Sequence, residues 1–438
     1  MTPNNPNFDI QSLGEATIPS PITVSYFTPD TKRILYDHDL SRLSEHCWDK
    51  GPPAAIEVAG PREMIYYDPP KTKAAIVTCG GLCPGINDVI RAIVMELSHR
   101  YGVSNIVGIK YGFQGLIPRY GHDMLDLTTE LVKDVHAVGG SILSSSRGKQ
   151  DITEMVNVLK RMNVDIFFCI GGDGTMRATE LITEEILKRK LEISVIGIPK
   201  TIDNDIGFIE KTFGFETAFT HAVDSIRTAH VEARGYQNGV GLVKLMGRQS
   251  GYITANASIA SQDVNFCLIP EIPIDLEGEN GFYKHLLDRI QRKNHAVIVV
   301  AEGVGDRFCS LDEKDVSGNR KSGDIGIFLR EGIGRYFKER KVPVALKYID
   351  PSYIIRSSCA IPSDSIFCNQ LAQNAVHAGM AGKTGMLVGI WNNCFTHVPI
   401  DIAIRNRKFI DPESMFWLNV LETTGQPRWM QNIPRVTG

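Results

Sequence analysis

Two stretches of the sequence decide the fold: DIFFCIGGDGT at residues 165–175 and ISVIGIPKTIDND at residues 193–205. In each stretch a short apolar run comes directly before a turn that contains glycine or proline and at least one aspartate. Such a run, bounded by a turn, is typical of a strand that is buried on both faces in a parallel sheet. The two stretches therefore predict an α/β fold.

The same alternation of strand, turn and helix continues outward from these stretches. An apolar run at residues 74–78 comes before a glycine turn. After that turn, apolar side chains recur every three or four residues from Ile86 to Leu97, which predicts one buried face of a helix. Further buried strands are expected at residues 240–245, 296–301 and 386–390. Together these strands are enough for two mainly parallel sheets covered by helices.

The length of the chain predicts more than one lobe. Its 438 residues, of which 43% are hydrophobic and 22% charged, exceed what one hydrophobic core usually holds. Prolines interrupt the first part of the chain, which is expected to form an accessory arm. The expected boundaries are an N-terminal arm at residues 1–68, a first lobe at 69–207 completed by about 360–382, and a second lobe at 208–359 completed by about 383–438.

Composition excludes several classes of partner. With a formal net charge of -3, the chain has no general attraction for nucleic acid or for an anionic membrane. No apolar stretch approaches the roughly 20 residues of a membrane helix, and the first residues lack the features of a signal peptide. Nine cysteines are scattered through apolar runs, which is typical of reduced core thiols. We therefore expect a cytoplasmic protein without nucleic-acid or membrane partners.

Turns at the ends of the predicted strands carry the candidate chemistry, because ligands of open α/β sheets bind where strands end and helices begin. In the turn GGLCPG at residues 80–85, the glycines are explained either by a tight turn or by a phosphate that approaches the backbone at Gly81. Asp173 follows an apolar strand directly. It either caps the next helix or binds Mg²⁺ that carries phosphates.

A third turn, Pro199 to Asp205, holds two carboxylates two residues apart. In extended backbone both carboxylates lie on one side of the chain. One carboxylate at such a position can accept the proton of a hydroxyl that attacks a phosphate, although a solvated acidic turn is the alternative. Glu302 also ends an apolar strand, which is where α/β enzymes place ligand contacts.

From about residue 73 to residue 396, the chain resembles the phosphofructokinases. Seven motifs in the same order carry the resemblance, at residues 80–85, 145–148, 171–175, 199–205, 244–248, 301–303 and 347–356. The resemblance implies the phosphofructokinase fold, with two Rossmann-like three-layer lobes, the first binding nucleotide and the second sugar phosphate. It further implies a homotetramer under allosteric control that uses ATP to phosphorylate fructose 6-phosphate at the 1-hydroxyl in glycolysis.

The resemblance also implies roles for individual residues. The ATP site would consist of Gly81, Arg147, Gly148, Gly172, Asp173, Gly174 and Thr175, with Asp173 on Mg²⁺. The sugar phosphate would be bound by Thr201, Ile202, Asp203, Met246, Gly247, Arg248, Glu302, Lys347, Tyr353, Ile354, Ile355 and Arg356. The catalytic residues would be Asp203, as the base for the 1-hydroxyl, together with Lys200, Thr201 and Arg248.

Two residues give opposite indications about the phosphoryl donor. Gly174 stands where diphosphate-dependent members commonly have Asp, and glycine leaves room for the α-phosphate of ATP. Lys200 resembles the diphosphate-dependent branch, since bacterial ATP-dependent members typically have glycine there. The resemblance is therefore to ATP-dependent enzymes built on the diphosphate-type framework, as in plants, protists and some bacteria. The alternatives are a diphosphate-dependent enzyme and a non-catalytic regulatory subunit that binds sugar phosphate.

Overall fold

The computed structural model describes residues 6–40, 43, 53–314, 320–405 and 407–432. These residues form two compact units, each assembled from segments that lie far apart in the sequence. Unit 1 draws on the ranges 1–201, 206–214 and 357–407, and unit 2 on 202–205, 215–356 and 408–438. Within the described residues, no helix is both long enough and apolar enough to cross a membrane.

Unit 1 is built on a nine-stranded sheet with the order β3-β4-β19-β18-β10-β9-β6-β7-β8. In this order the strands are Arg33–Leu35, Ala55–Val58, Cys394–Pro399, Met386–Trp391, Ser194–Pro199, Ile166–Gly171, Lys73–Thr78, Asn105–Ile109 and Met124–Asp126. The five strands from β18 to β7 run parallel to one another, and antiparallel strands extend both edges. The strands predicted at residues 74–78, 165–170, 193–198 and 386–390 are confirmed.

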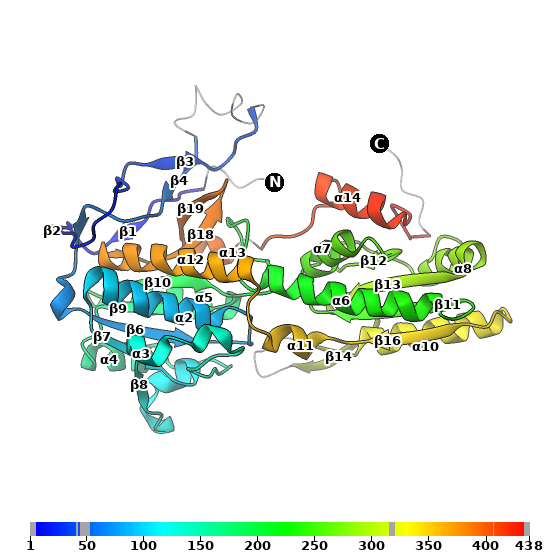
Figure 1. Ribbon diagram of the computed structural model, residues 1–438, viewed down its shortest axis with the longest axis horizontal. Helices are drawn as coiled ribbons and strands as arrows, with labels where there is room; N and C mark the ends of the chain where they lie inside the picture. Colours follow the sequence, from blue (N-terminus) through cyan, green and yellow to red (C-terminus); the bar gives the residue numbers. More distant parts are fainter. Residues whose placement is uncertain (1–5, 41–42, 44–52, 315–319, 406, 433–438) are drawn as a thin grey trace. The chain divides into compact units, whose positions relative to one another are not determined.

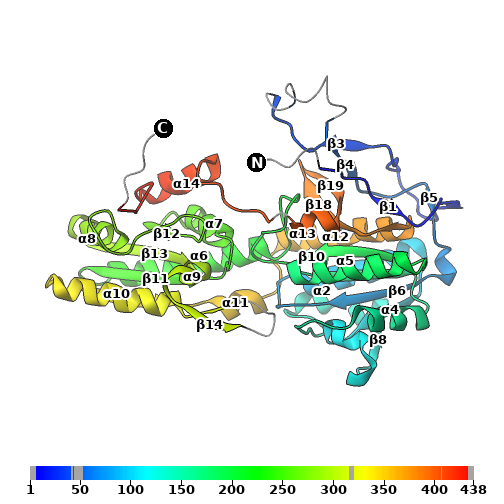
Figure 2. The ribbon, with the colours of Figure 1, turned by 180° about the vertical axis from the view of Figure 1, so that it is seen from behind.

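Helices cover both faces of the nine-stranded sheet (Figures 1 and 2). On one face α2 (Ile86–Met95) packs against α12 (Pro362–Met380), and on the other α4 (Ile152–Arg161) packs against α5 (Asp173–Lys188). Alternate residues of the strands, such as Ala75, Val77 and Phe167, are buried with apolar residues of α4 and α5 in one core. The short helix α13 (Ile400–Arg405) contacts α5.

Unit 2 contains a parallel four-stranded sheet with the order β12-β13-β11-β16. Its strands are Phe266–Leu268, His295–Ala301, Gly239–Leu245 and Ala345–Ile349. Helices α6 (Phe215–Arg234) and α7 (Tyr252–Ser261) contact one another; α6 contacts the strands β11 and β13, and α7 contacts β13. Helices α8 (Phe282–Lys293) and α10 (Ile325–Glu339) share a second core with the sheet. The predicted α/β fold with two mainly parallel sheets is thus confirmed.

Three further parts of unit 2 lie outside its sheet. A hairpin of β14 (Ser310–Lys314) and β15 (Arg320–Ser322) lies within the segment after β13. Helix α11 (Ser352–Ser357) follows β16, and its residues up to Arg356 belong to unit 2. Helix α14 (Met415–Thr424) packs against α7 and is drawn in red in Figure 2.

The structure corrects the expected domain boundaries in three places. At the boundary expected after residue 207, residues 202–205 belong to unit 2 and residues 208–214 to unit 1. Residues 1–68 were expected as an accessory arm, but their strands β3 and β4 belong to the sheet of unit 1. Residues 383–407 were expected in the second lobe, but they supply β18, β19 and α13 to unit 1. Edge strands of three or four residues are too short to show a period in the sequence, which explains why β3 and β4 were not predicted within residues 1–68.

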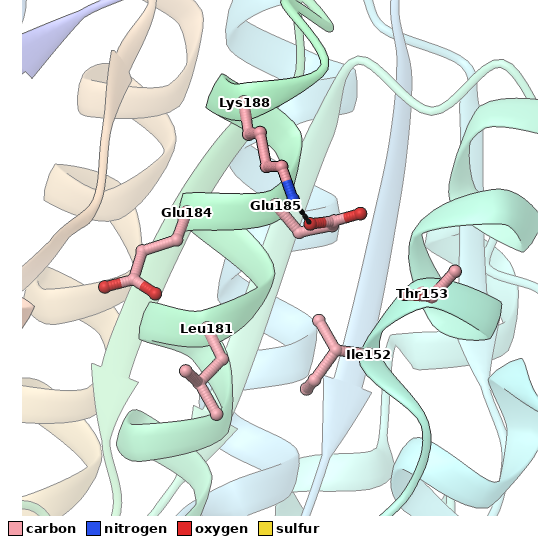
Figure 3. A pocket seen from close by; sticks show the side chains of 6 residues that line it. All are labelled: Ile152, Thr153, Leu181, Glu184, Glu185 and Lys188. Carbon is pink, nitrogen blue, oxygen red and sulfur yellow. Dashed lines mark ion pairs between the residues drawn. The ribbon is translucent and has the colours of Figure 1, made fainter.

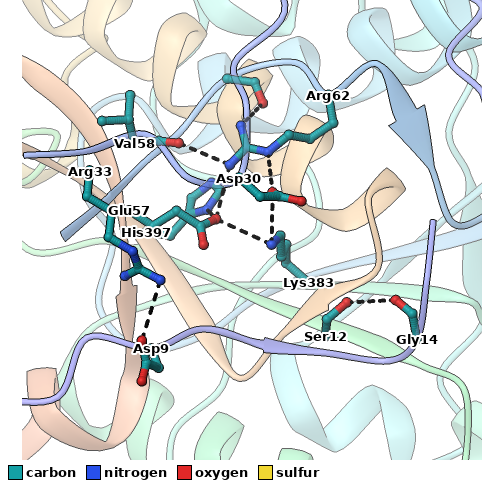
Figure 4. Close-up of polar contacts among 11 residues, drawn as sticks. Asp9, Ser12, Gly14, Asp30, Arg33, Glu57, Val58, Arg62, Lys383 and His397 are labelled. Carbon is teal, nitrogen blue, oxygen red and sulfur yellow. Dashed lines mark hydrogen bonds and ion pairs between the residues drawn. The ribbon is translucent and has the colours of Figure 1, made fainter. Parts of the chain in front are cut away.

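Buried charged side chains hold the N-terminal segment on unit 1 (Figure 4). Arg62 donates hydrogen bonds from Nη2 to Glu57 Oε1 at 3.0 Å and from Nε to Asp30 Oδ1 at 2.8 Å. Glu57 Oε1 also accepts from His397 Nδ1 on β19 at 2.9 Å, and it lies 3.5 Å from Lys383 Nζ. Burial opposes ionisation of Glu57, but the His397 hydrogen bond and the nearby positive charges hold its pKa well below the usual value.

Candidate active site

The central strands of unit 1 bring two of the predicted motifs to one edge of the sheet. Strands β6, β9 and β10 are in register, with Thr78 beside Ile170 and Ile170 beside Ile198. The turns at residues 80–85 and 171–175 follow these strands and therefore start side by side. This edge is the carboxyl end of a parallel sheet, where ligands of such folds bind.

The backbone of the first turn is fixed by two side chains. Gly80 adopts φ +85°, in the left-handed region that favours glycine. Its carbonyl oxygen accepts a hydrogen bond from Ser145 Oγ at 2.7 Å, and the carbonyl oxygen of Gly81 accepts one from Lys200 Nζ. Lys200 is only 4% exposed, so its ammonium group lies at this edge rather than in solvent. The site therefore has a fixed positive charge beside its glycine turn.

The loop that carries Arg147 and Gly148 lies next to the same turn. Gly80 N donates to Ser146 O at 3.2 Å, which joins the two segments. Arg147 itself is exposed, and Gly148 adopts φ +98°. The structure thus brings together these two predicted ATP-site residues and the turn that contains Gly81.

Asp173 is the first residue of α5 and comes directly after Gly172. The N-terminus of a helix carries a partial positive charge and unpaired N–H groups, which suit phosphate. A Cβ added at Gly172 would lie 3.3 Å from Lys200 O, whereas one at Gly174 would meet nothing within 4 Å. There is therefore open space beside Gly174.

The carboxylate of Asp173 is the candidate metal ligand. Its Oδ2 accepts hydrogen bonds from Arg407 Nη2 at 2.8 Å and from Arg177 Nε at 3.2 Å. Within the described residues, Oδ1 takes part in no hydrogen bond. One hard oxygen ligand suits Mg²⁺ that arrives on ATP phosphates and keeps several of its waters. The residues present therefore fit the expected metal.

Sequence reasoning missed both arginines that hold Asp173. Arg177 stands four residues later on the same helix, a spacing at which oppositely charged side chains meet, so a signal for it exists. Arg407 lies 234 residues away, and nothing in the sequence indicates that it meets Asp173.

The boundary between the two units passes through the third predicted motif. Lys200 and Thr201 belong to unit 1, whereas Ile202 and Asp203 belong to unit 2. Within unit 2 the carbonyl oxygen of Asp203 accepts a hydrogen bond from Ser250 Oγ at 2.8 Å. That bond fixes the backbone of the predicted base, whose side chain is partly exposed.

The predicted turn after β11 packs tightly against the end of β13. Gly247 adopts φ +118°, and its carbonyl oxygen accepts from Gly303 N at 3.1 Å. A Cβ on Gly303 would lie only 1.8 Å from Arg248 O, so no larger residue fits there. This close approach of backbones brings Glu302 next to the turn of Met246, Gly247 and Arg248.

Glu302 is a largely buried carboxylate that interacts electrostatically with several charged side chains. Burial raises its pKa above the usual value, and the positive charges of Lys244, Arg248 and Arg356 offset part of that rise. Because these charges act on one carboxylate, three predicted residues, Glu302, Arg248 and Arg356, belong to one electrostatic group in unit 2.

Helix α11 carries four of the predicted sugar-phosphate residues. Tyr353 and Ile354 are 85% and 70% exposed, so their side chains are accessible to a ligand. Ile355 is 1% exposed and packs into the unit, which makes its side chain a structural one. Arg356 is partly buried and stands at the last turn of the helix.

Lys244, the first residue of the predicted 244–248 motif, had no predicted role of its own, and in the structure it positions the start of α11. Lys244 Nζ lies 2.7 Å from Asp324 Oδ2 and 2.8 Å from Asp350 Oδ2. Asp350 Oδ1 in turn accepts from Ser352 N at 3.1 Å, at the first residue of α11. Burial opposes the charge of Lys244, but the hydrogen bonds to the two carboxylates raise its pKa.

The structure does not bring Lys347 to this group. Lys347 pairs with Gly241 in the sheet, four residues before the end of β11, a separation of about 13 Å along a strand. Its Nζ lies over the ring of Tyr236, 5.0 Å from the centroid. The register of β16 against β11 and the contact with the Tyr236 ring together explain why the Lys347 side chain lies away from the group around Glu302.

A surface hollow of unit 1 lies away from the predicted residues (Figure 3). It is lined by Ile152, Thr153, Leu181, Glu184, Glu185 and Lys188, from the start of α4 and the end of α5. Lys188 Nζ lies 3.9 Å from Glu185 Oε2 within it. None of the candidate site residues lines this hollow, so it is not the candidate active site.

Comparisons with known proteins agree with the resemblance in the motifs. The model of the family described as phosphofructokinase matches residues 73–379. An ATP-dependent 6-phosphofructokinase of Borreliella burgdorferi is 48% identical over 440 residues, covering 98% of this chain and 98% of that protein. One of Amycolatopsis methanolica is 44% identical, with 98% and 96% covered. The solved pyrophosphate-dependent phosphofructokinase from Marinobacter aquaeolei has a TM-score of 0.65 at 16% identity, covering 83% of this chain and 94% of that one, so it shares the fold.

Proposed function

The chain belongs to the phosphofructokinase family, and we propose that it uses ATP to phosphorylate fructose 6-phosphate at the 1-hydroxyl. The products are fructose 1,6-bisphosphate and ADP, a step of glycolysis. The observation that carries the proposal is the similarity over 98% of the chain to proteins named ATP-dependent 6-phosphofructokinase. The open space beside Gly174 supports ATP as the donor, because it leaves room for the α-phosphate.

Asp203 is the proposed catalytic base. Its carboxylate accepts the proton of the 1-hydroxyl as that hydroxyl attacks the terminal phosphate of ATP. The hydrogen bond from Ser250 to its backbone supports this role, because a base must be held in a fixed position relative to the hydroxyl.

Unit 1 provides the groups proposed to bind the donor. The ammonium of Lys200 and the N–H groups at the start of α5 stabilise the charge on the phosphoryl group during transfer. Gly81, Gly172 and Gly174 let phosphates approach the backbone, and Arg147, Gly148 and Thr175 complete the ATP site. Asp173 would hold Mg²⁺, which when bound neutralises negative charge on the phosphates.

Unit 2 provides the groups proposed to bind the sugar phosphate. Arg248, Tyr353 and Arg356 bind phosphate and sugar oxygens, and a guanidinium group matches phosphate oxygens in charge and shape. Glu302 accepts hydrogen bonds from sugar hydroxyls. Ile202, Met246, Gly247 and Ile354, which also belong to unit 2, line the same proposed subsite.

Replacement of the base tests the proposed mechanism. For Asp203→Ser we expect kcat to fall by at least about two orders of magnitude, the scale of general base catalysis. Binding of fructose 6-phosphate, measured by calorimetry, should be retained, because the variant keeps the other sugar contacts. If kcat stays near that of the unchanged enzyme, Asp203 is not the base.

A diphosphate-dependent enzyme is the second candidate, and Lys200 favours it. Turnover with ATP and with diphosphate, measured side by side on the purified chain, decides between the donors. Faster turnover with diphosphate would contradict the use of Gly174 as the deciding residue. Any Mg²⁺-dependent turnover excludes the non-catalytic regulatory subunit.

We further propose, from the family alone, a homotetramer in the cytoplasm under allosteric control. Light scattering on the purified chain measures its mass in solution. A monomer at the concentrations used for activity would contradict the tetramer.

A further inference from the structure

Asp173 is held by two arginines that come from different parts of unit 1. Arg407 Nη2 reaches Asp173 Oδ2 at 2.8 Å, and its side chain is 30% exposed. Arg177 Nε reaches the same oxygen at 3.2 Å, and its side chain is 53% exposed. The Arg407 contact is therefore the shorter and the better shielded from solvent.

Arg407 also contacts the chain that follows the proposed base. It forms an antiparallel bridge with Ile206, which comes three residues after Asp203. The next residue, Lys408, donates from its backbone N to Asp205 O at 3.1 Å. Arg407 thus joins the carboxylate at the start of α5 to the segment that follows the 203–205 turn.

Both arginines bind the same oxygen of Asp173, and this has a geometric consequence. With Oδ2 anchored, rotation of the carboxylate is restricted and Oδ1 is presented in one direction. Groups that hydrogen-bond to a metal ligand in this way orient it, and their loss typically weakens metal binding. An exposed ion pair contributes little to the free energy of unfolding. We therefore expect the loss of Arg407 to change the orientation of the Asp173 carboxylate rather than the stability of the fold.

We propose that Arg407 is a positioning residue that fixes Asp173 for the Mg²⁺ complex of ATP and joins it to Ile206 within unit 1. The inference rests on the proposed role of Asp173 as metal ligand. Arg177 contributes to the same arrangement, because its Nη2 also donates to Ile404 O at 2.8 Å, at the end of α13.

The test measures binding as well as turnover. Binding of a non-hydrolysable ATP analogue with Mg²⁺ is followed by calorimetry, without sugar phosphate, for Arg407→Met, Arg407→Lys and Asp173→Asn. Arg405→Met is the matched control. Arg405 lies two residues away and pairs with Asp401 at 3.2 Å, with its side chain 71% exposed, so this variant removes the same charge without touching Asp173.

We expect Arg407→Met to weaken binding of the Mg²⁺–analogue complex about tenfold, as for other groups that orient a metal ligand. Arg407→Lys should restore part of the loss, because an ammonium can make one hydrogen bond to Oδ2. Arg405→Met should leave affinity unchanged. The KM for ATP should rise in Arg407→Met while the KM for fructose 6-phosphate stays the same.

A double variant separates positioning from direct contact. In the Asp173→Asn background, Arg407→Met should add little further loss, because the residue that Arg407 positions is already changed. A full additional loss would mean that Arg407 binds ATP itself, and it would overturn the proposal. So would unchanged or tighter binding by Arg407→Met alone.

Failure of the proposed metal role gives a different result. If Asp173→Asn binds the Mg²⁺–analogue complex normally, the assignment of Asp173 as metal ligand is wrong. If Asp173→Asn binds weakly but Arg407→Met and Arg407→Lys bind normally, only the positioning role fails. Thermal unfolding of each variant shows whether it is folded. If Arg407→Met does not fold, the binding measured for Arg407→Lys still tests the positioning role.

Discussion

The carboxyl ends of the two sheets present different chemical groups. In unit 1 the edge beside β6 and β9 consists of glycine turns, a helix N-terminus and one buried lysine, Lys200. In unit 2 the corresponding edge beside β11 and β13 carries a cluster of charged side chains around Glu302 and Lys244. A long chain of phosphates needs space and backbone N–H groups, whereas a sugar phosphate needs separate partners for its hydroxyls and its phosphate.

The largest expected effect comes from filling the space in unit 1. For Gly174→Asp we expect kcat/KM for ATP to fall at least about 100-fold, because a like charge placed against a phosphate costs several kcal/mol. The fold should tolerate the change, since a Cβ at Gly174 meets nothing within 4 Å and an acidic residue suits the first turn of a helix.

Gly174→Ala is the control for this variant. It adds a side chain without charge in the same space, so kcat/KM for ATP should stay within about threefold, given that alanine favours a helix more than glycine. Steady-state kinetics with ATP and with diphosphate measure both variants. Unchanged use of ATP by Gly174→Asp would show that the donor is not selected at this position.

An intermediate effect is expected from the charged cluster of unit 2. Lys244→Met leaves Asp324 and Asp350 without their shared cation, so the start of α11 should lose its fixed position. We expect the KM for fructose 6-phosphate to rise about tenfold, as for the loss of a hydrogen bond to a charged group, with the KM for ATP unchanged.

Lys347→Met is the matched control for this lysine and tests the sequence prediction as well. Its ammonium lies over Tyr236, so the KM for fructose 6-phosphate should change by less than about twofold, since an exposed cation over a ring contributes little. A large rise in KM for this variant, without one for Lys244→Met, would reverse our assignment of the two lysines.

The smallest effect concerns stability and Glu180, a partly buried carboxylate on α5. Burial, together with the charges of Asp401 and Glu184, raises the pKa of Glu180 to about 7, and Arg405 offsets part of this. The folded protein thus holds this proton to higher pH than the unfolded chain does. The stability from that proton is complete at acid pH and is lost as pH rises from about 4.5 to about 7.

Glu180→Gln should therefore stabilise the protein at pH 8 by about 1 to 2 kcal/mol, a value reduced for partial exposure, and change little at pH 5. Urea unfolding at both pH values measures the difference. Glu422→Gln, an exposed substitution on α14, is the control and should have no effect at either pH. A variant less stable than the parent at pH 8 would contradict the assignment.

The parallel strands and their turns could be predicted from the sequence because each is local. An apolar run such as residues 166–170, followed by glycine, identifies both a buried strand and the edge where it ends. Asp173 and Glu302 were identified in the same way, from a carboxylate that comes directly after such a run. Position at a strand end is thus readable without knowing what surrounds it.

The partners of these carboxylates could not be predicted, because they come from distant parts of the chain. Arg407 and Asp173 meet only because α13 packs on α5, and Asp324 meets Lys244 only when α10 lies beside β11. The same reason explains why residues 383–407 were assigned to the other lobe. The position of Lys347 depends on the register of β16, which its own sequence does not fix.

The buried charges that hold the N-terminal segment have a consequence for protein synthesis. Strand β4 ends at Val58, but β19, with which it pairs, ends at Pro399. At ordinary rates of translation β4 waits for its neighbour on the order of 20 to 70 s. During that interval Glu57 and Arg62 can pair with each other, since both leave the ribosome early. The edge of the sheet in unit 1 where β4 pairs with β19 therefore forms late, after Lys383 and His397 have been synthesised.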